Sequence, residues 1–253
     1  MDIYSSFGFI DVIVAIVGVY GFYSWYMLVK KHEIKKTLLI GGDTNPAKCK
    51  DIDGFADFMG EKFIVNKNVL IPRDETEILV RKSIEIINQK HYKNALDIGT
   101  GSGCIACMIA KNTDCQILGV DISSDALHIA LDNASKLNLY NKAIFRKSDI
   151  YSKIRETFDI IISNPPYIPR NTELQKEVQF DPELALFAND DKGLEFYKRI
   201  SENAPLNKNG CLIFELGINQ SEDVKNIMTK NGFKNIEIIK DLAGIDRVIL
   251  GYL

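Results

Sequence analysis

The sequence predicts an α/β protein built on a mostly parallel sheet of seven strands, with helices on both faces. Two observations predict this class. From residue 94 onward the chain contains short, continuously apolar segments. These segments alternate with stretches in which apolar residues recur at helical spacing. Strands of this kind are typical of a sheet covered on both faces, because a strand with one wet face alternates apolar and polar residues instead.

The expected elements follow from these patterns. Strands are expected at 94–99, 115–121, 143–149, 158–163, 211–217, 235–241 and 247–253, and helices near 102–112, 124–138, 191–204 and 219–231. Before them, "KFIV" and "VLI" are separated by three polar residues and are expected to pair as a hairpin. "DETEILVRKSIEIIN" carries apolar residues at helical spacing and is expected to form a helix.

The N-terminal stretch 7–29 is apolar on all faces and holds a single charge, Asp11. Its 23 residues suffice to cross a bilayer as a helix, and aromatic residues followed by "KKHEIKK" suit an interfacial belt with a positive cytoplasmic flank. A buried helix of a small N-terminal domain is the alternative. We expect a membrane anchor at 1–30, a polar linker at 31–60, a hairpin and helix at 61–90 and a cytoplasmic main domain at 91–253.

Composition excludes several classes of protein. With 46% hydrophobic and 26% charged residues, the chain is typical of a globular protein rather than a disordered one. A net charge of −3 gives no electrostatic support for binding a nucleic-acid backbone. Five cysteines form no disulfide framework, and Cys104 and Cys107 fall in an apolar helix, where packing is expected rather than metal binding. No metal site is expected.

Polar and glycine residues follow the predicted strands where a ligand of an open sheet would bind. The first strand continues into the alternating glycines of "LDIGTGSGCIA" (96–106), which allow a ligand to approach the main chain. The second ends in Asp121, whose carboxylate can accept the hydroxyls of a ribose, and the third in Asp149, which could meet an adenine amino group. The glycine pattern also fits a dinucleotide-binding motif, so a nicotinamide enzyme is an alternative at this point.

The fourth strand ends in "SNPPYIP" (163–169). Asn164 offers a side-chain carbonyl, and the carbonyls of Pro165 and Pro166 are acceptors with fixed directions, because prolines lock their own φ and donate nothing through their nitrogens. Acceptors held in this way suit a substrate NH₂ group, and Tyr167 offers a flat wall for a planar amide or base.

The chain resembles the HemK/PrmC family of class I S-adenosylmethionine-dependent methyltransferases. The resemblance covers about residues 60–253 and rests on "NKNVLIPRDETEILV", "ALDIGTGSGCIA", "GVDIS", "FDIIISNPPYIP", "DPELALFANDDKGLEFYKRI", "FELGINQ" and "DLAGIDRVILGYL". It implies a Rossmann-like methyltransferase sheet and methyl transfer to the side-chain nitrogen of a glutamine in the Gly-Gly-Gln loop of peptide chain release factors. The alternatives are an amino methyltransferase acting on adenine or guanine, or on another protein glutamine.

The resemblance also implies roles for individual residues. It implies that S-adenosylmethionine is bound by Gly99, Thr100, Gly101, Ser102, Gly103, Asp121, Asp149 and Ile150, with Asn164 beside them. The acceptor glutamine is gripped by Asn164, Pro165, Pro166 and Tyr167, of which Asn164, Pro165 and Tyr167 are the expected catalytic residues. Pro72, Arg73 and Thr76 are expected to close the pocket.

The expected chemistry depends on how the acceptor is held. An amide nitrogen is a poor nucleophile, since its lone pair is delocalised into the carbonyl. The Asn164 side chain and the Pro165 carbonyl are expected to bind its two N–H groups and to orient its lone pair, which can contribute several kcal/mol. Family members usually begin with a helical domain that helps to recognise the release factor, and this chain differs there, so the choice of partner follows less directly than the chemistry.

Overall fold

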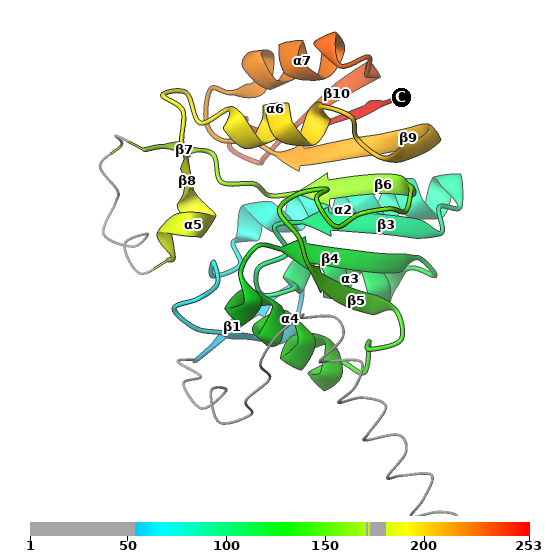
Figure 1. Ribbon diagram of the computed structural model, residues 1–253, viewed down its shortest axis with the longest axis vertical. Coiled ribbons are helices and arrows are strands. Elements are labelled where there is room, and N and C mark those ends of the chain that lie inside the picture. The colour runs from blue at the N-terminus through cyan, green and yellow to red at the C-terminus, as the bar shows by residue number, and fades with distance from the viewer. Residues whose placement is uncertain (1–53, 171, 173–180) are drawn as a thin grey trace, which may run out of the picture. The chain divides into compact units, whose positions relative to one another are not determined.

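The computed structural model describes residues 54–170, 172 and 181–253. Within these residues the main sheet has seven strands in the order β10-β11-β9-β6-β3-β4-β5, which can be followed from top to bottom in Figure 1. The strands are β3 (Asn94–Ile98), β4 (Gln116–Asp121), β5 (Ala143–Lys147), β6 (Phe158–Ser163), β9 (Leu206–Glu215), β10 (Lys234–Lys240) and β11 (Asp246–Tyr252). Of the seven strands, β11 alone runs opposite to the other six, so the prediction of a mostly parallel seven-stranded sheet is confirmed.

Helices cover both faces of this sheet, as the sequence predicts. One apolar cluster joins the sheet to α2 (Asp74–Lys90), α3 (Cys104–Asn112) and α4 (Ser124–Lys136), and a second joins it to α6 (Glu195–Ser201) and α7 (Ser221–Lys230). Neighbouring residues of one strand serve opposite faces: in β6, Ile160 and Ile162 belong to the first cluster and Ile161 to the second. All three are fully buried, which explains why the strand is apolar without interruption.

The predicted hairpin has a different partner strand. "KFIV" lies in β2 (Glu61–Val65), which pairs with β1 (Gly54–Phe58) and not with "VLI". The turn between them is Met59-Gly60, and both residues have positive φ, 49° and 80°, as a tight two-residue hairpin requires. The prediction is therefore wrong about the partner, and residues 54–60, which the sequence assigned to the linker, belong to the hairpin.

One buried side chain connects the hairpin to the loop that follows β3, residues 99–103, which we call the glycine loop. Asn133 of α4 accepts a hydrogen bond from the Ile64 amide at 2.7 Å and donates to the Ile64 carbonyl at 3.0 Å. It also donates to the carbonyl of Ser102 at 2.9 Å. A single amide therefore holds β2 and the glycine loop together.

Three short elements follow β6 in the chain. β7 (Ile168–Pro169) pairs in parallel with β8 (Phe187–Ala188), and α5 (Glu183–Leu186) directly precedes β8. Because of this pairing, the segment after "SNPPY" and the segment "DPELALFA" lie side by side (Figure 1).

The predicted anchor and most of the predicted linker lie outside the described residues, so they stay predictions, as does the division into domains. Across residues 54–170, 172 and 181–253, no helix is both long and apolar enough to cross a membrane.

Candidate active site

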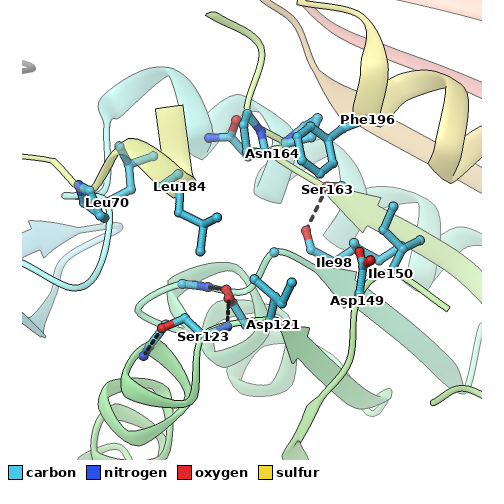
Figure 2. A pocket seen from close by; sticks show the side chains of 18 of the residues that line it. Leu70, Ile98, Asp121, Ser123, Asp149, Ile150, Ser163, Asn164, Leu184 and Phe196 are labelled. Carbon is cyan, nitrogen blue, oxygen red and sulfur yellow. Dashed lines mark hydrogen bonds between the residues drawn. The ribbon is translucent and has the colours of Figure 1, made fainter. Parts of the chain in front are cut away.

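The carboxyl ends of β3, β4, β5 and β6 meet at one edge of the sheet. The register places Ile98 opposite Val120 and Ser163, and Asp121 opposite Lys147, so the residues that follow each strand are brought together. They enclose a cavity of about 360 Å³. Figure 2 shows Leu70 and Leu184 on one side of this space, with Asp121, Ile150 and Asn164 also around it.

The glycine loop contributes main chain to the cavity at two positions. Gly99 (φ 71°) and Gly101 (φ 52°) line it, and a Cβ added to either would meet no atom closer than 3.9 Å. Gly103 differs, because its added Cβ would lie 2.9 Å from the Cβ of Ala130 in α4. Gly103 therefore permits α3 and α4 to pack, whereas Gly99 and Gly101 leave room for a ligand.

The two polar residues of this loop point away from the cavity. Thr100 and Ser102 are buried, and neither lines the cavity. The Thr100 hydroxyl donates to the carboxyl of Asp97 at 2.6 Å. Asp97 is fully buried, its Oδ1 has no hydrogen-bond partner among the described residues, and burial raises its pKa to about 7.

Asp121 faces the cavity with both oxygens already held by main chain. Its Oδ2 accepts from the Gly101 amide at 3.0 Å and its Oδ1 from the Ser123 amide at 2.9 Å. Burial raises the pKa of Asp121, and these two amides oppose the rise. Each carboxylate oxygen has a second lone pair, so the group can still accept two hydroxyls of a sugar.

Asp149 and Ile150 follow β5 and also line the cavity. Both oxygens of Asp149 accept from the guanidinium of Arg199, each at 2.8 Å, so the carboxylate predicted to meet an adenine amino group is already paired. Ile150 has a φ of 46°, an unfavourable conformation for a β-branched residue, and the Ser148 hydroxyl donates to its carbonyl at 2.8 Å. The chain therefore turns at Ile150, at the edge of the cavity.

Asn164, Pro165 and Pro166 line the cavity from the end of β6, as predicted for the acceptor side. The amide nitrogen of Asn164 donates to the Thr76 hydroxyl at 3.3 Å. Among the described residues, the Asn164 carbonyl oxygen accepts no hydrogen bond. We call Asn164–Tyr167 the acceptor side, and Gly99–Gly103, Asp121, Asp149 and Ile150 the cofactor side.

Tyr167 does not line the cavity, unlike the flat wall that the sequence predicts. Its hydroxyl is 3.5 Å from Oε1 of Glu215, the last residue of β9, and its main-chain carbonyl accepts from Gln220 at 3.0 Å. Burial raises the pKa of the Tyr167 hydroxyl. The aromatic ring lies over the chain at Gly217, where an added Cβ would lie 3.0 Å from it. Tyr167 is thus held at both ends by the segment "FELGINQ".

Several lining residues carry no prediction from the sequence. They belong to the loop before α2, to the segment of α5 and to α6: Asn68, Val69, Leu70, Pro182, Leu184, Ala185, Phe196 and Arg199. The first two segments are joined by Asp181, which accepts from the Ile71 amide at 3.1 Å and pairs with Arg73 at 2.6 Å. Both fall within the segments that carry the resemblance, which was the available signal. Arg73 and Thr76 support the walls of the cavity without lining it.

Among the described residues, no group of three histidine, cysteine, aspartate or glutamate side chains is arranged to hold a metal ion. Cys104 and Cys107 are buried in the first apolar cluster, and burial raises the pKa of both thiols.

The comparisons with known proteins agree with this geometry. A family described as "Methyltransferase small domain" matches residues 75–180. The chain is 41% identical over 204 residues to a release factor glutamine methyltransferase of Clostridium acetobutylicum, covering 77% of this chain and 71% of that protein. It is 41% identical over 206 residues to one of Streptococcus pneumoniae, covering 79% and 72%. The chain belongs to the release factor glutamine methyltransferase family.

Solved structures show the same fold in more distant proteins. A methyltransferase from Pyrococcus furiosus has a TM-score of 0.54 at 19% identity, covering 82% of this chain and 93% of that one. The Thermus thermophilus 16S rRNA N2 G1207 methyltransferase, in complex with AdoMet and guanosine, has a TM-score of 0.56 at 16% identity, covering 78% and 49%. The predicted methyltransferase fold and the resemblance to the release factor glutamine methyltransferase family are therefore confirmed. The dinucleotide interpretation of the glycine loop is set aside.

Proposed function

We propose that this protein transfers a methyl group from S-adenosylmethionine to the side-chain amide nitrogen of a glutamine in a peptide chain release factor. The observation that carries the proposal is the position of Asn164-Pro165-Pro166. They lie at the end of β6 and face the same cavity as Asp121 and the glycine loop. Membership of the release factor glutamine methyltransferase family supports the choice of acceptor.

The cofactor side fits a nucleoside cofactor of this kind. A Cβ at Gly99 or Gly101 would project into open space at the cavity, so these positions leave room for a ligand against the main chain. Asp121 supplies a carboxylate for ribose hydroxyls, and Ile150 and Phe196 supply apolar surface for a base. S-adenosylmethionine would supply an electrophilic methyl group on a positively charged sulfur.

The acceptor side provides what an unreactive amide needs. The side-chain carbonyl oxygen of Asn164 and the main-chain carbonyl oxygen of Pro165 can each accept one N–H of the acceptor amide. When both hydrogens are held, the nitrogen lone pair has one direction, and orientation of this kind accounts for several kcal/mol of a reaction barrier. The nitrogen would lose a proton after transfer. None of the described residues that line the cavity is a histidine, so we assign no general base.

The proposal is tested by incubating the protein with labelled S-adenosylmethionine and a release factor, followed by mass spectrometry of the glutamine-containing peptide. We expect the added methyl group on the glutamine side chain and at least hundredfold slower transfer by Asn164→Ala. Isothermal titration with S-adenosylmethionine shows whether the variant still binds its cofactor. Undiminished transfer by Asn164→Ala would contradict the role of the acceptor side.

We also propose, from the sequence alone, that residues 7–29 attach the protein to a membrane and leave residues 91–253 on the cytoplasmic side. The support is the apolar run with its aromatic and basic flank. Carbonate washing of membranes tests this, and release of the protein into the supernatant would contradict a spanning helix.

A further inference from the structure

The segment "FELGINQ" (214–220) carries part of the resemblance, yet none of its residues lines the cavity. Its last residue, Gln220, is 8% exposed and directly precedes α7. The side-chain nitrogen of Gln220 donates to the main-chain carbonyls of Tyr167 at 3.0 Å and Lys192 at 2.9 Å. The carbonyl of Gly193 lies 3.4 Å from the same nitrogen. One buried amide therefore joins the acceptor side to the segment before α6 and to the turn before α7.

The oxygen end of the same amide is bound by the turn itself. Oε1 of Gln220 accepts from the Gly217 amide at 3.1 Å, and the Tyr197 hydroxyl lies 3.3 Å from it. Main-chain carbonyls only accept and a main-chain N–H only donates, so these neighbours decide which end of the carboxamide faces which. A reversed Gln220 would place its oxygen against two carbonyls and its NH₂ group against the Gly217 N–H. The amide thus has one favourable orientation.

Two glycines allow the three segments to approach this amide. A Cβ at Gly193 would overlap the carbonyl oxygen of Tyr167, and a Cβ at Gly217 would overlap Oε1 of Gln220. Gly193 also has a φ of 69°, in the left-handed region that favours glycine. Side chains are therefore excluded at both positions as long as Gln220 binds the Tyr167 carbonyl.

The acceptor side is a short segment that has to be held at its ends. It leaves the sheet at the end of β6, a strand that is paired with β3 and with β9. Pro165 and Pro166 have no N–H, so no main-chain donor of theirs can fix them. At the far end the Tyr167 carbonyl accepts from Gln220, and β7 begins with the next residue. The bond from Gln220 therefore positions the peptide that ends the acceptor side.

We propose that Gln220 is a positioning residue that binds the Tyr167 carbonyl and thereby holds Asn164 and Pro165 where they can bind the acceptor amide. The role in methyl transfer rests on the proposed function, whereas the hold on Tyr167 does not. Gln220 does not line the cavity and acts through the main chain of the acceptor side.

The hold on Tyr167 can be measured at a single peptide bond. The sequence contains one Tyr-Ile pair, Tyr167-Ile168, so full-length protein labelled with ¹³C at tyrosine carbonyls and ¹⁵N at isoleucine gives one carbonyl–amide correlation by NMR. We expect this carbonyl signal to move upfield in Gln220→Met, because the carbonyl loses its hydrogen bond. Gln89→Met, an exposed change on α2, is the matched control and should leave it in place. A signal that is unchanged in Gln220→Met overturns the proposal.

Methyl transfer to the release factor gives the second readout, with rates expressed per cofactor-binding site counted by isothermal titration. Gln220→Met should lower kcat at least about tenfold, because a small misplacement of positioning groups is enough to cost such a factor. The KM for the release factor and the affinity for S-adenosylmethionine should stay within about twofold. A purely structural role would lower the number of binding sites and leave the rate per site unchanged, and that result overturns the proposal.

Gly217→Ala is a second variant that leaves Gln220 in the chain. Its Cβ would meet the end of the Gln220 side chain rather than main chain, so the carboxamide is displaced at little cost to the fold. We expect both the carbonyl signal and kcat to change in the same direction as in Gln220→Met. If thermal unfolding shows that Gln220→Met loses the fold, Gly217→Ala decides, and no change in either measurement overturns the proposal.

The two readouts separate the two hypotheses. If the unmodified protein transfers no methyl group to a release factor, the proposed function fails, and the Tyr167 carbonyl signal still decides whether Gln220 holds the acceptor side.

Discussion

The two sides of the cavity are held in place by different means. At the glycine loop and Asp121 of the cofactor side, contacts join residues close in sequence: Thr100 to Asp97, three residues apart, and Gly101 to Asp121, twenty apart. Asp149 of the same side is held by Arg199, 50 residues away. On the acceptor side, Asn164 is held by Thr76, 88 residues away, and Tyr167 by Gln220, 53 residues away. The first is built from neighbouring strands and their turns, the second from α2 and from the chain between β9 and α7.

The difference teaches where each function resides in the chain. The glycine loop and Asp121 are formed by β3, β4 and the turns that follow them, whereas the acceptor side depends on the sheet being assembled across its width. Each side also has one buried carboxyl group, Asp97 for the cofactor side and Glu215 for the acceptor side, and one oxygen of each has no hydrogen-bond partner among the described residues.

The largest expected effect is a dependence of stability on pH to which both carboxyl groups contribute. Burial raises the pKa of both to about 7, so the folded state holds a proton that the unfolded chain releases near pH 4. The stability that each contributes is complete at about pH 4 and is lost as the pH rises through about 7. The loss is roughly 4 kcal/mol for each group, at about 1.4 kcal/mol per pKa unit. Denaturant unfolding across this range should show the decline, with Asp97→Asn and Glu215→Gln each removing its own part. A free energy of unfolding that rises over this range would contradict the expectation.

The next largest effect divides binding from transfer. Asp121→Asn should weaken S-adenosylmethionine binding about a hundredfold, because a charge-assisted acceptor and its hold on Gly101 are both lost. Asn164→Ala should change that affinity less than about threefold while it abolishes most transfer. Isothermal titration and single-turnover kinetics measure the two quantities, and Asp125→Asn, an exposed aspartate of α4, is the matched control. Equal losses of affinity in both variants would show that the two sides are not separate.

A third effect lies within the glycine loop. Gly103→Ala should lower the free energy of unfolding by about 2 kcal/mol, since its Cβ would meet Ala130 at 2.9 Å in a left-handed conformation. Gly99→Ala should cost only about 1 kcal/mol of stability, as backbone strain, and weaken cofactor binding about tenfold by projecting into the cavity. Parallel denaturant unfolding and titration would distinguish them. The reverse pattern would reassign the two glycines.

The smallest effect concerns Arg199. Its pair with Asp149 is about half exposed, with side-chain exposures of 40% and 46%, so Arg199→Ala should change cofactor affinity less than about threefold. Titrations at low and high salt should converge in the variant, because screening acts on the pair that it lacks. A change of tenfold or more would mean that Arg199 contacts the ligand itself.

The sequence predicts the sheet and the strand-end motifs because these depend on local patterns. Continuous apolar runs identify the strands, and the parallel register then brings Asp121, Asp149 and Asn164 to one edge. The prediction of the hairpin is wrong because "VLI" is apolar for another reason: its first two residues, Val69 and Leu70, line the cavity.

The remaining site residues depend on contacts between distant segments. Nothing in the residues near Asp149 indicates Arg199, 50 positions later. Thr76 is expected at the pocket from the resemblance, but its hydrogen bond with Asn164 depends on the fold. Tyr167 is expected to offer its flat ring to the ligand, but β7 pairs with β8 and Gln220 binds the Tyr167 carbonyl, and the Tyr167 hydroxyl lies near Glu215 instead.

The Asn133 side chain forms hydrogen bonds with both Ile64 of β2 and the Ser102 carbonyl, and this affects how a ligand can enter and leave the cavity. Since one buried amide bonds both, β2 cannot swing outward without distorting the turn that faces the cofactor. We expect traffic into and out of the cavity to pass instead beside residues 182–185, where Leu184 is 59% exposed and no comparable amide ties the chain to the sheet within the described residues.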